Sequence, residues 1–188
     1  MTINTKPFKK RSIYGGLSGN IAFIRRFMEI VKIPLMSKEE YDSLIREEHI
    51  SRIAFKGDKY PYIAPFLYVF DGNYMYFLST RYGRKMEYFK QNPHVTVEVE
   101  KLSRDLSEYA FVTLSGRLVE VEDAAKKKAI RDDFVRLIKS KSLSKNIMAA
   151  LGHSPQEPVE AIVSEERSLI WRLAGVSKIT GLKNETIR

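Results

Sequence analysis

One stretch of the sequence, from Tyr74 to Pro93 (YMYFLSTRYGRKMEYFKQNP), combines several residue types that bind phosphate. It opens as a strand ending in the hydroxyls of Ser79 and Thr80. It then passes through a glycine-containing turn and continues with Arg84 and Lys85 at the start of a predicted helix. Hydroxyl donors, fixed positive charges and the free N–H groups of a helix N-terminus each favour a bound anion. The pattern therefore predicts a site for a cofactor with a phosphate tail.

Other sequence patterns for catalysis or cofactor binding are missing. There is no cysteine, which excludes disulfides, cysteine nucleophiles and thiolate metal sites. His49, His94 and His153 have no metal-ligand spacing with one another or with a carboxylate, so no metal site is expected. The chain contains no G-x-S-x-G, Walker A or G-x-G-x-x-G motif. The predicted phosphate site is therefore of a non-Rossmann kind.

The composition is that of a globular protein with excess positive charge. The 188 residues, 44% of them hydrophobic, suffice for one domain with its own core. No apolar run is long enough to span a membrane and no secretory signal is visible, so we expect a soluble, cytoplasmic protein. The net charge of +9 comes from 32 basic and 23 acidic residues. It is compatible with nucleic acid, an anionic membrane surface or an anionic cofactor as the partner.

We expect the chain to divide into an N-terminal segment and one larger domain. Residues 1–33 are predicted to form a basic arm followed by an amphipathic helix. Residues 34–188 are predicted to form the main domain, which begins with a helix at 37–48 carrying an S-x-x-E capping-box pattern. A helical insertion is expected at about 124–151, before the last strand.

Apolar, aromatic and β-branched runs with alternating pattern predict six strands. They are expected at about 50–56, 60–70, 74–80, 94–101, 109–121 and 160–173. Antiparallel strands with aromatic and β-branched faces, in this number, favour a small barrel. We therefore predict a mainly β fold with flanking helices.

Two of these strands contain residues that disturb a regular ladder. Pro61 and Pro65 cannot donate a backbone hydrogen bond, so the second strand should be an edge strand or should bulge near Pro65. A bulge would expose backbone groups suited to a flat heterocycle, and a plain edge strand is the equally weighted alternative. Gly116 breaks the fifth strand and indicates a bulge or a close approach by another segment.

The order of these features resembles the flavin-binding split-barrel proteins, the relatives of pyridoxamine 5′-phosphate oxidase that include the nitroimidazole-resistance-like branch. The resemblance covers residues 37–122 well and 160–183 loosely, and it does not include 1–33. The matching features are the strand Tyr62–Pro65, the turn Asp71-Gly72, the strand Tyr76–Thr80, the sequence Gly83-Arg84-Lys85 and the pair Asn92-Pro93.

This resemblance implies a six-stranded antiparallel split β-barrel that forms a homodimer with FMN at the subunit interface. The residues implied to contact the cofactor are Ile63, Ala64, Pro65, Ser79, Thr80, Arg84, Lys85 and Trp171. The hydroxyls and cations among them would hold the phosphate. The three residues of the second strand would lie against the ring system, and Trp171 corresponds to a tryptophan that contacts the flavin in some relatives.

Two positions depart from the family patterns. Leu78 stands where the nitroimidazole-resistance branch has a histidine, which puts a nitroreductase role in doubt. The sequence Arg172-Leu173-Ala174 lacks the Arg-x-His substrate motif of true pyridoxamine-phosphate oxidases. The resemblance therefore implies an FMN-dependent oxidoreductase acting on an unidentified small molecule, with a nicotinamide nucleotide as candidate reductant. No residue is nominated as general acid or base.

Two alternatives stay open at this point. The basic arm and the basic residues at 126–145 fit a nucleic-acid-binding module, which would retain DNA or RNA in a salt-sensitive way. The positive charge is spread over several segments and no recognised nucleic-acid motif accompanies it, which weakens that alternative. The same fold also hosts flavin-binding or haem-binding proteins without turnover, and fold alone does not decide between these functions.

Overall fold

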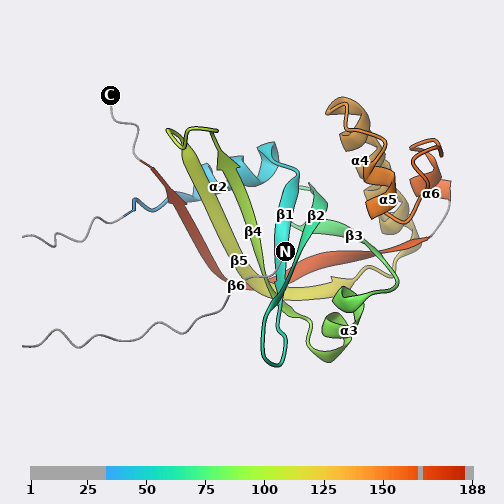
Figure 1. Cartoon of the computed structure of the whole chain (residues 1–188), viewed down its shortest axis with the longest axis horizontal. Coiled ribbons are helices and arrows are strands. Elements are labelled where there is room, and N and C mark those ends of the chain that lie inside the picture. The colour runs from blue at the N-terminus through green and yellow to red at the C-terminus, as the bar shows by residue number, and fades with distance from the viewer. Residues whose placement is uncertain (1–32, 165–166, 185–188) are drawn as a thin grey trace, which may run out of the picture. The chain divides into compact units, whose positions relative to one another are not determined.

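The computed structural model of the chain describes residues 33–164 and 167–184. The basic arm and amphipathic helix predicted for 1–33 lie outside these residues, except for the last residue of that range. Six strands form a closed barrel in the order β1-β2-β3-β6-β5-β4 (Figure 1). All neighbouring strands run antiparallel, so the predicted fold, a mainly β six-stranded antiparallel split barrel with flanking helices, is confirmed.

The first five strands begin and end within two residues of their predicted positions. The strands are β1 (Ile50–Phe55), β2 (Tyr62–Phe70), β3 (Met75–Thr80), β4 (His94–Leu102), β5 (Tyr109–Glu120) and β6 (Ser168–Lys183). The described helices are α2 (Lys38–Glu47), α3 (Arg84–Gln91), α4 (Ala124–Ser140), α5 (Ile147–Ala150) and α6 (Ala161–Ser164).

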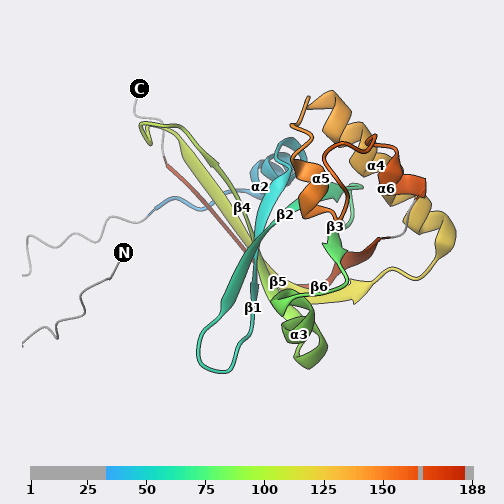
Figure 2. The same cartoon turned by 45° about the vertical axis from the view of Figure 1, so that its right-hand side comes forward.

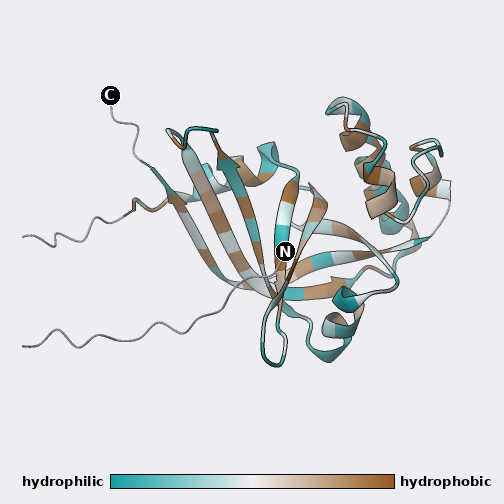
Figure 3. Cartoon of the chain, viewed as in Figure 1, coloured by the Kyte–Doolittle hydropathy of each residue, from teal (hydrophilic) through white to brown (hydrophobic). Residues whose placement is uncertain are grey.

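Hydrophobic residues alternate with more polar ones along the strands, as the brown and paler bands of Figure 3 show, and the inward-facing residues include several aromatic side chains. Phe55, Phe66, Phe77 and Trp171 point inward and are buried. The ring centroids of Phe66 and Trp171 lie 5.9 Å apart, and those of Phe55 and Trp171 lie 6.1 Å apart. Burial of each such side chain contributes about 1.5–3 kcal/mol, so this core fixes the strand ends that carry the site.

The helix α2 closes one part of the barrel and begins as its sequence pattern predicts. Ser37 accepts a hydrogen bond from the backbone of Glu40, and the Glu40 carboxylate accepts one from the backbone of Ser37, which completes the capping box. Ile45 is buried against the barrel, and its carbonyl accepts a 2.8 Å hydrogen bond from the Tyr68 hydroxyl. Burial raises the pKa of that hydroxyl, which keeps it protonated and able to donate.

The bulge predicted near Pro65 is absent, but the alternative prediction of an edge holds for the first part of the strand, because β2 residues 62–67 pair with β1 alone and only residues 68–70 also pair with β3. β2 pairs with β1 in unbroken register, and Pro65 lies opposite Arg52. The amide of Tyr68 donates to the carbonyl of His49, its partner in the ladder. Because hydrogen-bonded and non-hydrogen-bonded pairs alternate, position 65 is a non-hydrogen-bonded pair with β1. The proline therefore costs no hydrogen bond to β1.

A helical insertion between β5 and β6 covers one face of the barrel (Figure 2). The side chains of β2, β3 and β6 that point away from the barrel interior form a second core with this insertion. The members of this core are Leu67, Tyr76, Leu78 and Ile170 from the barrel, and Ile130, Phe134, Ile138, Met148, Leu151 and Ile162 from the insertion. Both faces of β3 are therefore buried, which explains why none of its residues is exposed.

The insertion extends beyond the predicted 124–151, and the prediction of a last strand at 160–173 is wrong. Residues 161–164 form the helical turn α6, in which Ala161 and Ile162 are buried. The strand β6 instead runs from Ser168 to Lys183. Its exposed second half carries little hydrophobic pattern, and it is a strand because it pairs with β5 as far as Ala110–Lys183. That pairing is nonlocal, so the sequence pattern alone could not show it.

The prediction of a bulge or close approach at Gly116 is confirmed on both counts. The register between β5 and β6 shifts between Ser115 and Arg117. A Cβ atom added at Gly116 would lie 2.9 Å from the carbonyl oxygen of Ala174, which is closer than real contacts allow. Only a residue without a side chain permits the two strands to approach at this point.

Candidate functional site

The strand β3 ends with two buried hydroxyls on opposite faces. Ser79 lies on the barrel-facing side with Phe77, and Thr80 lies on the outer side under the helical insertion. The Ser79 Oγ donates a 3.0 Å hydrogen bond to the carbonyl of Thr80. Thr80 pairs with Ser168 at the start of β6, so the neighbouring strand sets its position.

The turn after β3 presents the N-terminus of α3. Gly83 precedes the helix with a φ of 90°, in the left-handed region that glycine adopts without strain. Gly83 has no side chain that could cap the helix, so the N–H groups of Arg84 and Lys85 lack an intrahelical partner. Together with the helix dipole, these groups give the turn a partial positive charge that suits an anion.

Two cationic side chains follow this turn, one hydrogen-bonded and partly buried and the other exposed. The Lys85 Nζ donates to the Thr80 Oγ1 at 2.6 Å and lies 3.4 Å from the carbonyl oxygen of Tyr82. Burial lowers the pKa of Lys85. Arg84 is exposed and forms no hydrogen bond or ion pair with another described residue. We call the group formed by Ser79, Thr80, the α3 N-terminus, Arg84 and Lys85 the β3–α3 corner.

The three predicted residues of β2 lie beside an interruption in the barrel ladder. The ladder between β2 and β3 ends at the pair Tyr68–Phe77. If it continued in the same register, Pro65 would lie opposite Thr80 as a hydrogen-bonded pair. A proline has no N–H to donate there, so it cannot make the bond that would extend the ladder. We call this interruption between β2 residues 62–67 and the end of β3 the split.

The side chains at the split alternate in direction. Ala64 is buried toward the barrel interior, whereas Ile63 and Pro65 are exposed on the outer side. The backbone groups of the exposed pair that face away from β1 have no strand partner across the split in the described part of the chain. The structure thus places the β2 residues and the β3–α3 corner on the two sides of one interruption.

Trp171 is placed apart from the other predicted site residues. Its side chain is fully buried in the barrel, opposite Phe77 in the β3–β6 register. Its ring lies 4.8 Å from the ring of Phe89, which belongs to α3. In this structure Trp171 therefore supports the helix that opens at the corner, and a direct contact with a cofactor stays a prediction.

A model of the family described as pyridoxamine 5′-phosphate oxidase matches residues 37–178. The chain belongs to this family. The matched residues include the barrel strands as far as the middle of β6, the β3–α3 corner and the helical insertion. Membership confirms the resemblance seen in the sequence.

Solved structures with the same fold come from several bacteria. An FAD-binding protein from Mesorhizobium loti is 19% identical with a TM-score of 0.61, covering 82% of this chain and 100% of its own. A putative 5-nitroimidazole antibiotic resistance protein from Bacteroides thetaiotaomicron is 18% identical with a TM-score of 0.55, covering 81% and 87%. A haem storage protein from Vibrio cholerae is 12% identical with a TM-score of 0.57, covering 78% and 94%. At these identities the likeness shows the fold.

An uncharacterized protein of Rhizobium meliloti (strain 1021) is 28% identical over 89 residues. The aligned region covers 47% of this chain and 58% of that protein. The chain therefore matches little more than half the length of this curated relative.

The helical insertion contributes to the corner in a way that the sequence did not reveal. Gly152 has a φ of 88°, and a Cβ atom added there would lie 3.4 Å from the Thr80 Cγ2. The loop after α5 therefore packs directly on the outer face of Thr80. In this family member the insertion forms one wall of the corner.

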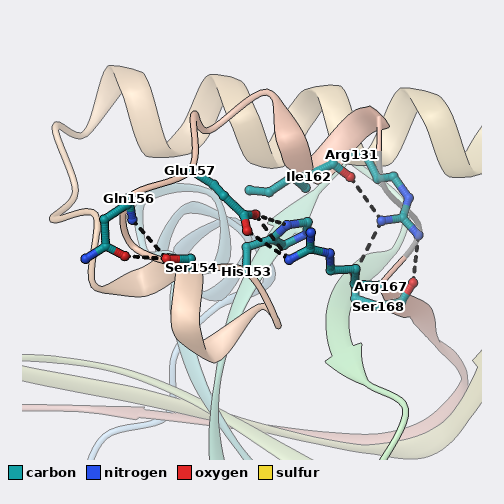
Figure 4. Close-up of polar contacts among 8 residues, drawn as sticks. All are labelled: Arg131, His153, Ser154, Gln156, Glu157, Ile162, Arg167 and Ser168. Carbon is teal, nitrogen blue, oxygen red and sulfur yellow. Dashed lines mark hydrogen bonds and ion pairs between the residues drawn. The ribbon is translucent and has the colours of Figure 1, made fainter.

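A buried arginine connects the insertion to the strand that positions Thr80 (Figure 4). Arg131 donates to the carbonyl of Ile162 at 3.1 Å, and to the Oγ and carbonyl of Ser168 at 3.3 Å and 2.7 Å. Sequence reasoning assigned this residue to a basic surface. The available signal was its spacing, because Arg131 lies three residues before the buried Phe134 and belongs to the same helix face.

A second polar group on the insertion lies near Arg131 in Figure 4. The Glu157 carboxylate contacts the His153 Nδ1 at 3.1 Å and accepts a 3.0 Å hydrogen bond from Arg167. Loss of solvent by itself raises the pKa of Glu157, but the hydrogen bonds from Arg167 and His153 outweigh it and hold that pKa below its ordinary value. The charge of Arg167 is therefore matched by a carboxylate.

Residues 33–164 and 167–184 contain no group of three or more side chains that could hold a metal ion. None of their helices is long and apolar enough to cross a membrane.

Proposed function

We propose that the β3–α3 corner binds the phosphate of FMN and that the protein is an FMN-dependent oxidoreductase. The observation that carries this proposal is the convergence of an uncapped helix N-terminus, the free Arg84 side chain, Lys85 and the Thr80 hydroxyl at one turn. A phosphate dianion bound there would gain charge-assisted hydrogen bonds from both cations, with Arg84 able to donate two at once. FMN fits this arrangement because its single phosphate ends the ribityl chain.

The split supplies a place for the flavin ring. Backbone groups of Ile63 and Pro65 that face away from β1 lack a strand partner there, and a planar heterocycle with polar edges can bond to such groups. Ala64, between them, gives the strand a small inward side chain. The flavin would supply hydride or electron transfer, while the protein binds it, orients it and sets its electrostatic surroundings.

The proposal includes a homodimer with one FMN at each end of the subunit interface. Large apolar side chains are exposed on parts of β1, β2, β4 and β6 away from the helical insertion, and a second copy would bury them. These side chains are Ile50, Ile63, Leu102, Val176 and Ile179. Size-exclusion chromatography with light scattering tests this part independently of the cofactor.

The substrate is proposed to be a small molecule, with a nicotinamide nucleotide as reductant. Leu78 is buried in the core under the insertion, so no side chain at this position can reach a substrate as a histidine would in the nitroimidazole-resistance branch. Arg172 lies 4.6 Å from the ring of Tyr74 and is committed to a cation–π contact on the outer face of the barrel. Neither position supports nitroreduction by that histidine or pyridoxal phosphate synthesis.

The cofactor proposal is tested by the visible spectrum of the purified protein. We expect a yellow protein, or a colourless one that takes up FMN with a stoichiometry near one per chain and then loses colour on reduction by NADH or NADPH. Parallel titrations with FAD and haem separate FMN from a dinucleotide flavin and from haem storage. A protein that binds none of the three would contradict the proposal, and uptake of FMN without turnover would support a flavin carrier instead.

The pH dependence of FMN affinity should show whether the charge of Lys85 contributes to phosphate binding. Since burial already places the pKa of Lys85 below its ordinary value of 10.5, FMN affinity is expected to fall as pH rises toward that value and the side chain loses its charge. The phosphate stays dianionic throughout, because its second pKa is about 6. Fluorescence titrations between neutral and alkaline pH measure this change. A Lys85→Arg variant keeps its charge and should lack the decline; an unchanged decline would assign the titration to another group.

The nucleic-acid alternative loses support from the ion pairs on α4. Four of the basic residues at 126–145 that suggested a nucleic-acid surface are paired with carboxylates in the structure. The pairs are Lys126–Asp71, Lys128–Asp132, Arg136–Asp133 and Lys139–Glu160. A phosphate backbone would have to displace these carboxylates, so the helix offers much less free positive charge than its sequence indicates.

A further inference from the structure

A groove of about 560 Å³ lies on the outer side of the barrel where β1, β4, β5 and β6 meet. It is lined by parts of these strands and by the start of the β1–β2 loop, and it contains no residue of the β3–α3 corner. We call it the β6 groove. Its size is within the range of pockets that hold small organic molecules.

The floor of the β6 groove is a register shift in the β5–β6 ladder, which we call the bulge. Ser115 pairs with Lys178 and Arg117 pairs with Ala174, so β6 residues 175–177 lie opposite Gly116 alone. Backbone groups of this segment are outside the ladder and can bind a ligand. The hydroxyl of Ser177 contributes further, and its only hydrogen bond to a described residue is a long one of 3.5 Å to the carbonyl of Ser115.

The walls of the β6 groove carry positive charge and no carboxylate. Lys56, His94 and Arg117 line it and are exposed. Lys56 and Arg117 form no ion pair with any described residue, whereas Arg52 on the same sheet is paired with Glu98 and Glu100. The His94 Nδ1 donates to the Asn92 side-chain oxygen at 3.0 Å, which orients the ring. An acid group entering this groove would find unpaired cations.

The rest of the lining is apolar. Ala54, Pro61 and Gly116 border the same space, whereas the side chains of the lining residues Phe55 and Val95 are buried in the barrel core, so the groove combines a small apolar surface with charge at its walls. A free inorganic ion would use only the cations, whereas a molecule with both an acid group and a flat apolar body would use the whole surface.

From these observations we infer that the β6 groove binds a small organic anion, namely an aromatic or otherwise apolar molecule carrying a phosphate or carboxylate group. Lys56 and Arg117 bind the acid group, the bulge and Ser177 supply hydrogen bonds, and the apolar wall holds the body of the ligand. This site is separate from the proposed flavin site and does not depend on it.

Isothermal titration with phenyl phosphate and with benzoate tests the inference, without FMN and with one equivalent of FMN per chain, which fills the proposed flavin site and leaves no excess to enter the groove. Benzamide is the uncharged control. We expect one acid to bind more tightly than benzamide, with FMN leaving the affinity unchanged. Replacing both cations in Lys56→Gln/Arg117→Gln should weaken binding at least about tenfold, because each charge-assisted hydrogen bond contributes substantially to affinity. Whichever of the two acids binds more tightly shows whether the groove prefers a phosphate or a carboxylate group.

The matched control is Arg104→Gln/Lys178→Gln, which removes the same charges from exposed positions outside the groove lining. It should bind as the parent protein does, and all variants should unfold at the same temperature because the four side chains are exposed. Equal weakening in both double variants, binding of neither acid, or competition by FMN would each overturn the assignment of a site in the β6 groove.

Discussion

The double substitution Arg84→Ala/Lys85→Ala is expected to abolish retention of FMN during purification. Each cation donates to the phosphate in the proposed complex, and a hydrogen bond to a charged group contributes about 1.5–3 kcal/mol. Loss of both should weaken FMN binding by about 100- to 10,000-fold, measured by quenching of flavin fluorescence. Each single substitution should have a smaller effect, and Arg84→Ala should cost more if the arginine binds in the two-pronged manner.

The control for this experiment is Lys90→Ala in the last turn of the same helix. It removes an exposed positive charge from α3 but leaves the N-terminal turn intact. FMN affinity should stay within about twofold of the parent value, because exposed charges a full helix away are screened. If Lys90→Ala weakened binding as much as the double substitution, the effect would be one of overall charge and the corner would lose its assignment.

Replacing the buried Arg131 by methionine is expected to destabilise the fold strongly. The change removes three hydrogen bonds to Ile162 and Ser168 and leaves buried carbonyl oxygens without a donor. Breaking such a buried network costs about 3–5 kcal/mol of the free energy of unfolding. Urea unfolding followed by circular dichroism measures this change, and the midpoint should shift without a change in slope.

Arg136→Met provides the comparison on the same helix. Arg136 is exposed and paired with Asp133 one turn away, and such surface pairs contribute about 0–1 kcal/mol. If both methionine variants lost the same stability, the cost would come from helix propensity or net charge and not from the bonds to Ser168. Because Ser168 pairs with Thr80, we also expect the Arg131 variant to bind FMN less tightly when it is folded.

The parts of the site that were predictable from the sequence are those formed by neighbouring residues. The end of β3, the glycine turn and the two cations of α3 occupy one short stretch, so their joint position follows from the chain itself. The capping box at Ser37 is likewise local, because both of its hydrogen bonds span three residues. The positions of the first five strands were correct for the same reason.

The parts that escaped prediction depend on residues distant in sequence. Pro65 correctly indicates an edge, but only the register with both neighbouring strands shows that this edge is limited to residues 62–67 and that the missing N–H faces the split. Arg131 reads as one more surface cation until the burial of α4 on β6 is known. The polar second half of β6 is a strand because β5 lies beside it.

The proline at the split bears on two properties of this fold, the stability that strand pairing gives and the ability to bind a cofactor. If β2 and β3 paired along their whole length, the barrel would gain backbone hydrogen bonds and rigidity. No unpaired backbone groups would then remain between these strands for a cofactor to bind. Because Pro65 has no N–H, the ladder between β2 and β3 stops, and the remaining backbone groups at the split stay available. In the proposed complex the flavin ring would form hydrogen bonds with these groups in place of a strand. Cofactor binding and stability of the fold would then be coupled, so the protein with bound FMN should have a higher melting temperature than the protein without it.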